Sequence, residues 1–537
     1  MIKKLLLFTI AITIIIYLYS CNNNNSKVMA AALDTIPKVS AKEMGIPGSF
    51  NPETTIQFDS LAIKKFTDSF PKFKQFAADI TQFYKARNYT YAWFDEKGMI
   101  EPANNLYNLI QNISEEGLPD SMPYKVAFIN LMEKELGNNS ININVELMLT
   151  YQYVAYAKTV WVGLSEKQSL STEWLLPRKK ITTKQMLDSL IDGNKILDNA
   201  PIYRQYSLLK EQLKKYYHLQ TTEKWLPIKM VAKRYTSGDS MNEIQKIRKR
   251  LFLLGDISAN NQSMLFDDVL YVGVKNLQRR FGYKEDGIIT SSLLAEINYP
   301  LIKRIEDIIV NMERARWVPI QLKKDYLLIN IPAYKLYAYE NDSLVFNMNV
   351  VVGKDQHKTV IFNGDMKYIV FSPYWNIPPS IIKNETLPAL KKNSNYLETH
   401  NMEWNNGSIR QKPGPNNSLG SVKFLFPNTH SIYLHDTPAK SLFNEDNRAF
   451  SHGCIRLAEP KKLAVYLLKN DSLWNKKNIT DAMNSGIERY VTLKKTVPVF
   501  IAYFTTWIDK EGKLNFRKDI YSRNSRLAKM ILKKPAI

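Results

Sequence analysis

The chain contains a cysteine flanked by residue types that could activate it as a nucleophile. Cys454 ends the run Ser451-His452-Gly453-Cys454, and His435 lies 454 − 435 = 19 residues before it. A thiol attacks acyl groups well only as the thiolate, and an adjacent imidazole lowers its pKa by stabilising that charge. Gly453 lets the backbone turn so that the Gly453 and Cys454 amides can face a developing oxyanion. The pattern predicts acyl transfer through a cysteine nucleophile.

Two other interpretations of these residues stay open. A lone cysteine is often a buried structural thiol, with no reactive role. A metal site formed by His435, His452 and Cys454 is the second alternative, although no carboxylate or fourth ligand stands at metal spacing. A papain-like protease fits less well, because its cysteine precedes its histidine in the chain and here the histidine comes first.

Short apolar strands are expected to position these residues. β-branched or apolar runs occur at 326–331, 345–352, 368–371, 422–426, 432–434 and 497–503. They predict a β-rich catalytic domain over 320–510, in which the run 432–434 delivers His435 to the loop of Cys454. A helix that opens near Pro460 should support that loop. The Pro/Asn/Gly-rich stretch at about 381–427 is too long for a simple connection, so we expect a lid or binding insertion.

The rest of the chain is predicted to be mostly helical. Helical spacing of apolar residues over 56–235 indicates a scaffold domain without a catalytic constellation. Residues 238–300 form a compact unit of three helices, the first ended by Gly255. Residues 21–55 are interpreted as a linker and 511–537 as a C-terminal tail. The expected fold class is therefore multidomain α+β.

The amino terminus has the pattern of an export signal. Lys3 and Lys4 precede an apolar run over 5–19, whose 15 residues at about 1.5 Å each are too short for a ~30 Å bilayer. Residues 1–20 therefore read as a signal peptide, and Ser20-Cys21 resembles a bacterial lipoprotein signal in which Cys21 becomes the lipid anchor. An uncleaved signal anchor is the alternative. Both predict export, and the resemblance favours the outer membrane.

Charge and composition limit the class of partner. Lys plus Arg minus Asp plus Glu is 73 − 51 = +22, so we expect an anionic partner. Export excludes nucleic acid and leaves acidic cell-wall polymers and anionic lipid. The two cysteines exclude a disulfide-stapled scaffold, and 45% hydrophobic residues argue against overall disorder.

At His435 and the run 451–454 the sequence resembles the L,D-transpeptidase family, whose YkuD-type catalytic domain has an upstream histidine followed by Ser/Thr-His-Gly-Cys. The resemblance covers most of the chain and extends to the large envelope-bound members. Residues 238–300 resemble the three-helix peptidoglycan-binding module. The supporting stretches are 314–319, 372–378, 410–415 and 423–428.

The resemblance implies roles for particular residues. Cys454 is the expected nucleophile and His435 the general base, oriented by a backbone carbonyl at the next position, where Asp436 replaces the glycine of many relatives. Gly453 and Cys454 supply oxyanion-hole amides. Ser451 and His452 shape the site.

Further residues are candidates for substrate binding. Arg456 could pair with a stem-peptide carboxylate or with a group inside the fold. Tyr374 and Trp375 could line the donor groove or belong to the core. Arg410 and Arg448, with Lys423, are candidates for anionic substrate groups, and as single charges they could also be solvated surface.

The predicted function is peptidoglycan 3→3 cross-linking through a cysteine thioacyl-enzyme. The expected partners are peptidoglycan stem peptides and glycan, with membrane attachment through Cys21 and no metal, nucleotide or other cofactor. The same acyl-enzyme could instead pass to water or to a protein lysine. A non-catalytic peptidoglycan-binding lipoprotein is the alternative from another class. The sequence makes no prediction of the oligomeric state.

Overall fold

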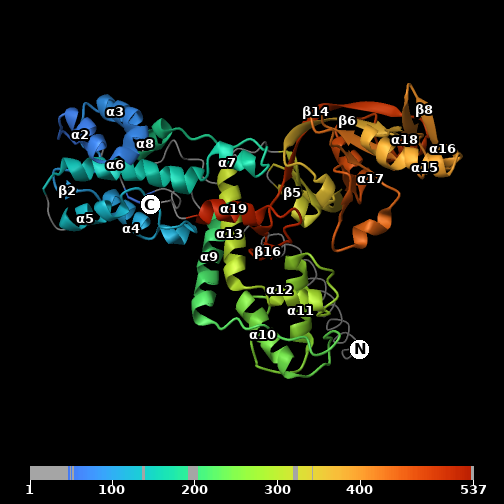
Figure 1. The fold of residues 1–537 in the computed structure, drawn as a ribbon, viewed down its shortest axis with the longest axis horizontal. Helices are drawn as coiled ribbons and strands as arrows, with labels where there is room; N and C mark the ends of the chain where they lie inside the picture. The colour runs from blue at the N-terminus through green and yellow to red at the C-terminus, as the bar shows by residue number, and fades with distance from the viewer. Residues whose placement is uncertain are drawn as a thin grey trace, which may run out of the picture.

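The chain folds into three lobes joined by a pair of long helices (Figure 1). The structure is a computed structural model that describes residues 46–48, 50, 54–135, 140–191, 204–318, 325–341 and 343–533. The predicted signal peptide and Cys21 lie outside the described residues. Within the described ranges, no helix is long and apolar enough to cross a membrane.

The first lobe is a helical bundle around one fully buried helix. This central helix, α6 (Ile143–Ala157), is buried from Val145 to Ala157. A helix covered on all sides is apolar around most of its circumference. Its buried Glu146 is an exception, and this carboxylate accepts hydrogen bonds from Tyr84 and from the backbone of Ala92 and Trp93. The helices of the bundle around it are α2 (Leu61–Ser69), α3 (Ala77–Ala86), α4 (Glu101–Gln111), α5 (Lys125–Glu135) and α8 (Thr183–Ile191), and α7 (Glu166–Ser171) lies beyond the end of α6 (Figure 1).

Two long helices, α9 (Gln205–Thr222) and α13 (Leu301–Trp317), pack side by side between the lobes (Figure 1). Glu313 on α13 is 1% exposed and accepts from the Trp317 indole at 2.8 Å and the Leu164 amide at 2.7 Å. Arg316 pairs with the same carboxylate at 2.8 Å. This buried pair lies within α13, and the helix is attached to the scaffold lobe by the Leu164 amide on Glu313 and by Arg316, which donates to the Val160 and Glu116 carbonyls.

The second lobe is the predicted three-helix unit. It consists of α10 (Asn242–Leu254), α11 (Asp268–Phe281) and α12 (Ser291–Ile297). The predicted end of the first helix is confirmed, since Gly255 caps it in the left-handed region at φ +85°. Gln278 donates to Asp286 and accepts from the Gly287 amide, which fixes the turn before α12.

The third lobe is built on a nine-stranded sheet that closes on itself. The strand order is β12-β5-β13-β11-β10-β6-β14-β3-β4, and β5 also pairs with β4. The strands are β3 (Tyr326–Asn330), β4 (Lys335–Glu340), β5 (Ser343–Gly353), β6 (Asn363–Phe371), β10 (Val422–Leu425), β11 (Leu434–His435), β12 (Ala449–Ser451), β13 (Ile455–Leu457) and β14 (Arg489–Ala502). Helices α17 (Pro460–Leu467) and α18 (Lys476–Asn484) pack beside it, and α17 is the helix predicted at Pro460.

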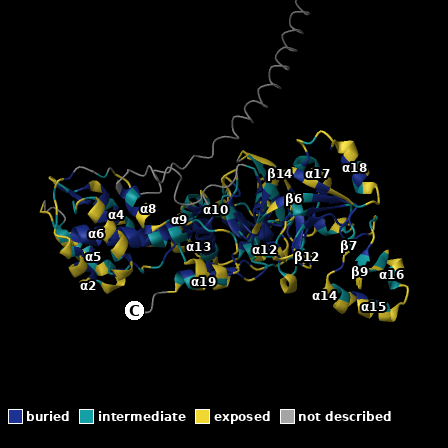
Figure 2. Ribbon diagram, turned by 90° about the horizontal axis from the view of Figure 1, so that it is seen from above, coloured by how far each residue is buried: buried dark blue, intermediate teal, exposed yellow. Residues whose placement is uncertain are grey.

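The predicted insertion contains a small subdomain that stands apart from the sheet (Figure 2). A three-stranded sheet, β7 (Trp375–Asn376), β9 (Ser408–Gln411) and β8 (Met402–Asn405), accompanies α14 (Pro379–Ile381), α15 (Leu387–Lys392) and α16 (Tyr396–Thr399). Its helices are largely exposed.

The segment predicted as a tail is folded up to residue 533, which corrects that prediction. Residues 511–533 contain β16 (Leu514–Phe516), which pairs with β15 (Thr506–Ile508), and α19 (Asn524–Leu532). Their apolar side chains are buried, and the Leu514 carbonyl accepts from Arg280 of the three-helix lobe. The other predicted boundaries stay predictions. The predicted fold class, multidomain α+β with a β-rich lobe, is confirmed.

Candidate active site

Two parallel strands bring the predicted nucleophile and base to one face of the sheet. Strands β11 and β13 pair in parallel with His435 opposite Arg456, and Cys454 directly precedes β13. Alternate residues along a strand share a face, so Cys454 and Arg456 lie on the same side as His435 and Tyr433. The intervening Leu434 and Ile455 are fully buried on the core side. His435 and Cys454, 19 residues apart in the sequence, therefore lie on neighbouring strands.

The His435 ring is oriented by the backbone. Its Nδ1 lies 2.5 Å from the carbonyl oxygen of Asp436. Because a carbonyl oxygen only accepts, Nδ1 carries the proton, and Nε2 keeps the lone pair that a general base requires. His435 is 5% exposed, so the ring is held within the fold.

The Asp436 side chain has a structural role. Its carboxylate accepts from the Ser421 amide at 2.9 Å, the Ser421 hydroxyl at 2.8 Å and the Thr437 amide at 2.7 Å, and it pairs with Lys440. Burial by itself raises the pKa of Asp436, but these hydrogen bonds, led by that from Lys440, bring it below its ordinary value. Asp436 thus fixes the backbone whose carbonyl orients His435.

Both partners are uncharged in the resting site. Burial, followed by the nearby Arg456 guanidinium, lowers the pKa of His435 to about 3. Burial raises the pKa of the Cys454 thiol, while Tyr433 and Arg456 act in the opposite direction. At neutral pH Cys454 is therefore a thiol and His435 a neutral imidazole, and the Cys454 Sγ lies 3.7 Å from the Ser431 carbonyl oxygen.

Tyr433 is a site residue that the sequence analysis missed. Hydrogen bonds between Tyr433 and Cys454 and between Tyr433 and Trp375 both contribute to the pKa of the phenol, which burial raises above its ordinary value. The Tyr433 ring also lies 5.7 Å from the His435 ring, centre to centre. Its position two residues before His435 on an apolar strand was the available signal. Trp375, a predicted groove residue, thus contacts Tyr433, which in turn contacts Cys454.

Residues 451–454, called the nucleophile loop because they carry the predicted nucleophile, are held by hydrogen bonds among themselves. The Ser451 hydroxyl donates to the Cys454 carbonyl at 2.5 Å and accepts from the Gly453 amide at 3.1 Å. Gly453 has φ +113°, a conformation that favours glycine. Since its amide already has a partner, Gly453 must give up that bond to serve an oxyanion, and both predicted oxyanion donors stay predictions.

His452 faces the insertion. Its Nε2 lies 3.0 Å from a Glu385 oxygen in the helical part of the insertion, and its ring centre is 5.0 Å from that of His357. His452 therefore links the nucleophile loop to the insertion. Among the described residues, no group of three or more His, Cys, Asp or Glu side chains is arranged to hold a metal ion.

The other predicted substrate residues have partners within the fold. Arg410 stacks over the Tyr374 ring at 4.0 Å and pairs with Glu403 at 2.6 Å. Arg448 donates to the Glu445 carbonyl at 2.5 Å. Lys423 lies 3.7 Å from Glu488. The Nε atoms of Arg448 and Arg456 are both buried without a hydrogen-bond partner in the described structure.

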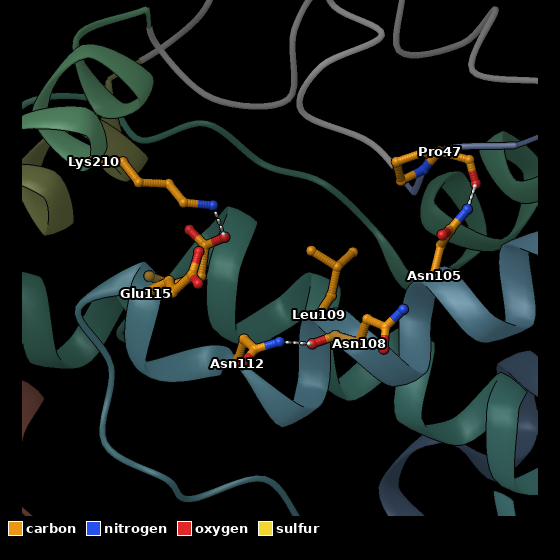
Figure 3. Close-up of a pocket in the computed structure, with 8 residues that line it drawn as sticks. Pro47, Asn105, Asn108, Leu109, Asn112, Glu115 and Lys210 are labelled. Carbon is orange, nitrogen blue, oxygen red and sulfur yellow. Dashed lines mark hydrogen bonds and ion pairs between the residues drawn. The ribbon is translucent and has the colours of Figure 1, made fainter. Parts of the chain in front are cut away.

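A cavity of about 200 Å³ lies far from this site, on the scaffold lobe (Figure 3). Asparagines along α4 line it, and the Asn105 amide donates to the Pro47 carbonyl at 3.0 Å. Its lining residues include none from the strand lobe, so the chemistry of Cys454 does not involve this cavity.

Comparisons with known proteins fall on the same regions. Residues 324–481 match the YkuD sequence family, described as the L,D-transpeptidase catalytic domain, and residues 78–213 match a family described as a scaffold domain. A curated Haemophilus influenzae protein, "Putative L,D-transpeptidase", is 31% identical over 242 residues, which are 41% of this chain and 48% of that protein. The chain thus spans about half the length of this curated relative.

Solved structures of similar proteins have low overall superposition scores. An L,D-transpeptidase from Xylanimonas cellulosilytica is 11% identical with a TM-score of 0.19, over 51% of this chain and 100% of that one. One from Stackebrandtia nassauensis is 11% identical with a TM-score of 0.22, over 51% and 97%. At such scores these structures carry no argument, and the similarity to L,D-transpeptidases rests on the sequence matches.

Proposed function

We propose, from the premise that this chain carries the catalytic domain of the L,D-transpeptidase family, that it forms 3→3 cross-links between peptidoglycan stem peptides. The observation that carries the proposal is the pairing of β11 with β13. The strand alternation puts Cys454 and His435 on one face of the sheet, and the bond from Nδ1 to the Asp436 carbonyl makes Nε2 the acceptor nitrogen of the ring.

In the first half-reaction the Cys454 sulfur attacks the carbonyl at the L-centre of diaminopimelate in a donor tetrapeptide. His435 Nε2 takes the thiol proton as the C–S bond forms, because the resting thiol is protonated. The C–N bond to the terminal D-alanine then breaks, and His435 returns the proton to the leaving amine. The product is a thioester on Cys454 and free D-alanine.

In the second half-reaction the side-chain amine of another diaminopimelate attacks the thioester. The C–N bond forms, the C–S bond breaks, and His435 carries the amine proton back to the sulfur. The energy of the original peptide bond is kept in the thioester, so the transfer balances without an added reactant.

Arg456 is proposed to bind a substrate carboxylate. Its guanidinium is partly exposed and lies on the face of Cys454, which suits a carboxylate of the stem peptide. A bound carboxylate would also cancel the charge that helps to lower the pKa of His435. Substrate binding would therefore make His435 a stronger base.

The chain outside the strand lobe is proposed to hold the enzyme at its substrate. The three-helix lobe, 238–300, would bind peptidoglycan and raise its local concentration, and the +22 charge suits a carboxylate-rich polymer. Cys21 would attach the protein to the periplasmic face of the outer membrane. Release of a Cys21→Ser variant from membranes would support the anchor, and continued retention would favour an uncleaved signal anchor.

Incubation of residues 27–537 with disaccharide tetrapeptide, followed by mass spectrometry, tests the function. A cross-linked dimer that lacks one D-alanine supports transpeptidation. Tripeptide alone supports an L,D-carboxypeptidase, and a stem peptide joined to a protein lysine supports tethering. The absence of all three products contradicts acyl transfer and favours a non-catalytic binding protein.

A further inference from the structure

A tyrosine from the C-terminal segment lies beneath the nucleophile loop, outside the residues that match the catalytic domain family. Tyr521 is 2% exposed, and its hydroxyl donates to the Gly353 carbonyl at 2.6 Å. The same hydroxyl accepts from the Thr359 amide at 3.1 Å. Tyr521 thus joins the two ends of the turn 353–359 that follows β5.

This turn is in direct contact with the nucleophile loop. The Thr359 hydroxyl accepts from the Gly353 amide at 2.9 Å and donates to the Gly453 carbonyl at 2.8 Å. A Cβ on Gly353 would come within 3.1 Å of the Gly453 Cα and 2.0 Å of the His357 carbonyl oxygen. Three backbone segments therefore meet where only glycine fits.

The Thr359 bond fixes more than one carbonyl group. The peptide that joins Gly453 to Cys454 is planar and trans, so its C=O and N–H point in opposite directions. Holding the Gly453 carbonyl on Thr359 therefore sets the direction of the Cys454 N–H. That amide is the predicted oxyanion donor, and an oxyanion donor acts only when it is aimed at the developing charge.

We infer that Tyr521, acting through Thr359, is a positioning residue that aims the Cys454 amide at the oxyanion formed during acylation. The inference rests on the proposed function. The hydrogen-bond chain runs from the Tyr521 hydroxyl to the turn, from the Thr359 hydroxyl to the Gly453 carbonyl, and through one peptide plane to the Cys454 amide. The C-terminal segment is thereby part of the catalytic machinery although it touches no substrate.

Two reactions of the same thiol separate this role from a general structural one. Acylation by a carbapenem such as meropenem passes through an oxyanion, whereas alkylation by iodoacetamide does not. Loss of a correctly aimed amide should slow acylation alone, since the thiol and His435 are unchanged.

The experiment measures both rates in the full soluble region, residues 27–537. Tyr521→Phe and Thr359→Val remove one hydroxyl each at nearly constant shape, and we expect a 10- to 100-fold slower acylation with an alkylation rate within about twofold of wild type. Thr359→Ser keeps the hydroxyl and should keep the wild-type rates.

Tyr503→Phe is the matched control. The Tyr503 hydroxyl donates to Asp519 at 2.6 Å and accepts from the Tyr521 amide at 2.9 Å, so its loss weakens the same segment without touching the turn. We expect acylation within about twofold of wild type.

Unchanged acylation in Tyr521→Phe and Thr359→Val overturns the inference and leaves the proposed function standing. An equal loss of acylation and alkylation also overturns it, because that result shows a displaced thiol. If the wild-type protein is alkylated but never acylated by meropenem or by tetrapeptide, the proposed function fails and the inference falls with it.

Discussion

Removal of the Arg456 charge should raise the pKa of the Cys454 thiol. Residues two apart on a strand lie about 7 Å apart, and at an effective dielectric constant of about 20 two unit charges at that distance interact by about 2 kcal/mol. Solvent at the half-buried guanidinium reduces this interaction, and we expect a shift of about one pKa unit. The sign is fixed, because a cation stabilises the thiolate.

The assay is the rate of alkylation by iodoacetamide as a function of pH. Because burial raises the thiol pKa and His435 is neutral, the wild-type profile should be a single rise with its midpoint above about 8.5. Arg456→Met should move that midpoint upward by about one pH unit. Arg456→Lys keeps the charge and should leave it within a few tenths of a unit.

An alkylation rate that stays high down to about pH 5 would refute this reasoning. It would show a thiolate–imidazolium pair in the resting enzyme. A midpoint that does not move in Arg456→Met, or that moves downward, would show that the guanidinium does not act on the sulfur.

Three further substitutions test other parts of the account. Ser451→Ala removes the hydroxyl that donates to the Cys454 carbonyl, and at about 1 kcal/mol for this bond we expect roughly fivefold slower acylation by meropenem, measured by stopped-flow; an unchanged rate contradicts the role. Asp436→Asn should cost about 1 kcal/mol in urea unfolding at pH 7. Because the folded-state pKa of Asp436 is lowered, this difference is present above the unfolded pKa of about 3.9 and lost as the pH falls through the folded value, so equal costs at pH 7 and pH 2.5 contradict it. Glu313→Ala leaves the buried Arg316 without its carboxylate and should lower the free energy of unfolding in urea by about 3–5 kcal/mol. Glu313→Gln should lose less, and a loss below about 1 kcal/mol in Glu313→Ala would show that Glu313 does not stabilise the contact between α13 and the scaffold lobe.

Apolar runs in the sequence predict six of the nine strands of the large sheet, and β4, β12 and β13 were not predicted. The predicted run 432–434 overlaps β11 at the buried Leu434. His435 and Cys454 stand out because few residue types can do acyl-transfer chemistry. Their proximity then depends on one parallel strand pairing, which the order of histidine and cysteine is compatible with but does not specify.

Long-range contacts explain what the sequence could not predict. Tyr521 lies 521 − 454 = 67 residues after the nucleophile, in a segment whose spacing of apolar residues gives no sign of its contact with the turn 353–359. Arg410 reads as a free cation in the sequence, and only the strand pairing of the insertion places it against Glu403 and the Tyr374 ring. Such partners are set by tertiary packing, which a local pattern does not encode.

The most direct test of the central claim is the intact mass of the protein during turnover of disaccharide tetrapeptide. We expect a transient adduct on Cys454 with the mass of the donor minus D-alanine, followed by a dimer that lacks one D-alanine. Both should be absent in Cys454→Ala, and the adduct should form far more slowly in His435→Ala. A cross-linked product formed equally well by Cys454→Ala would contradict the account.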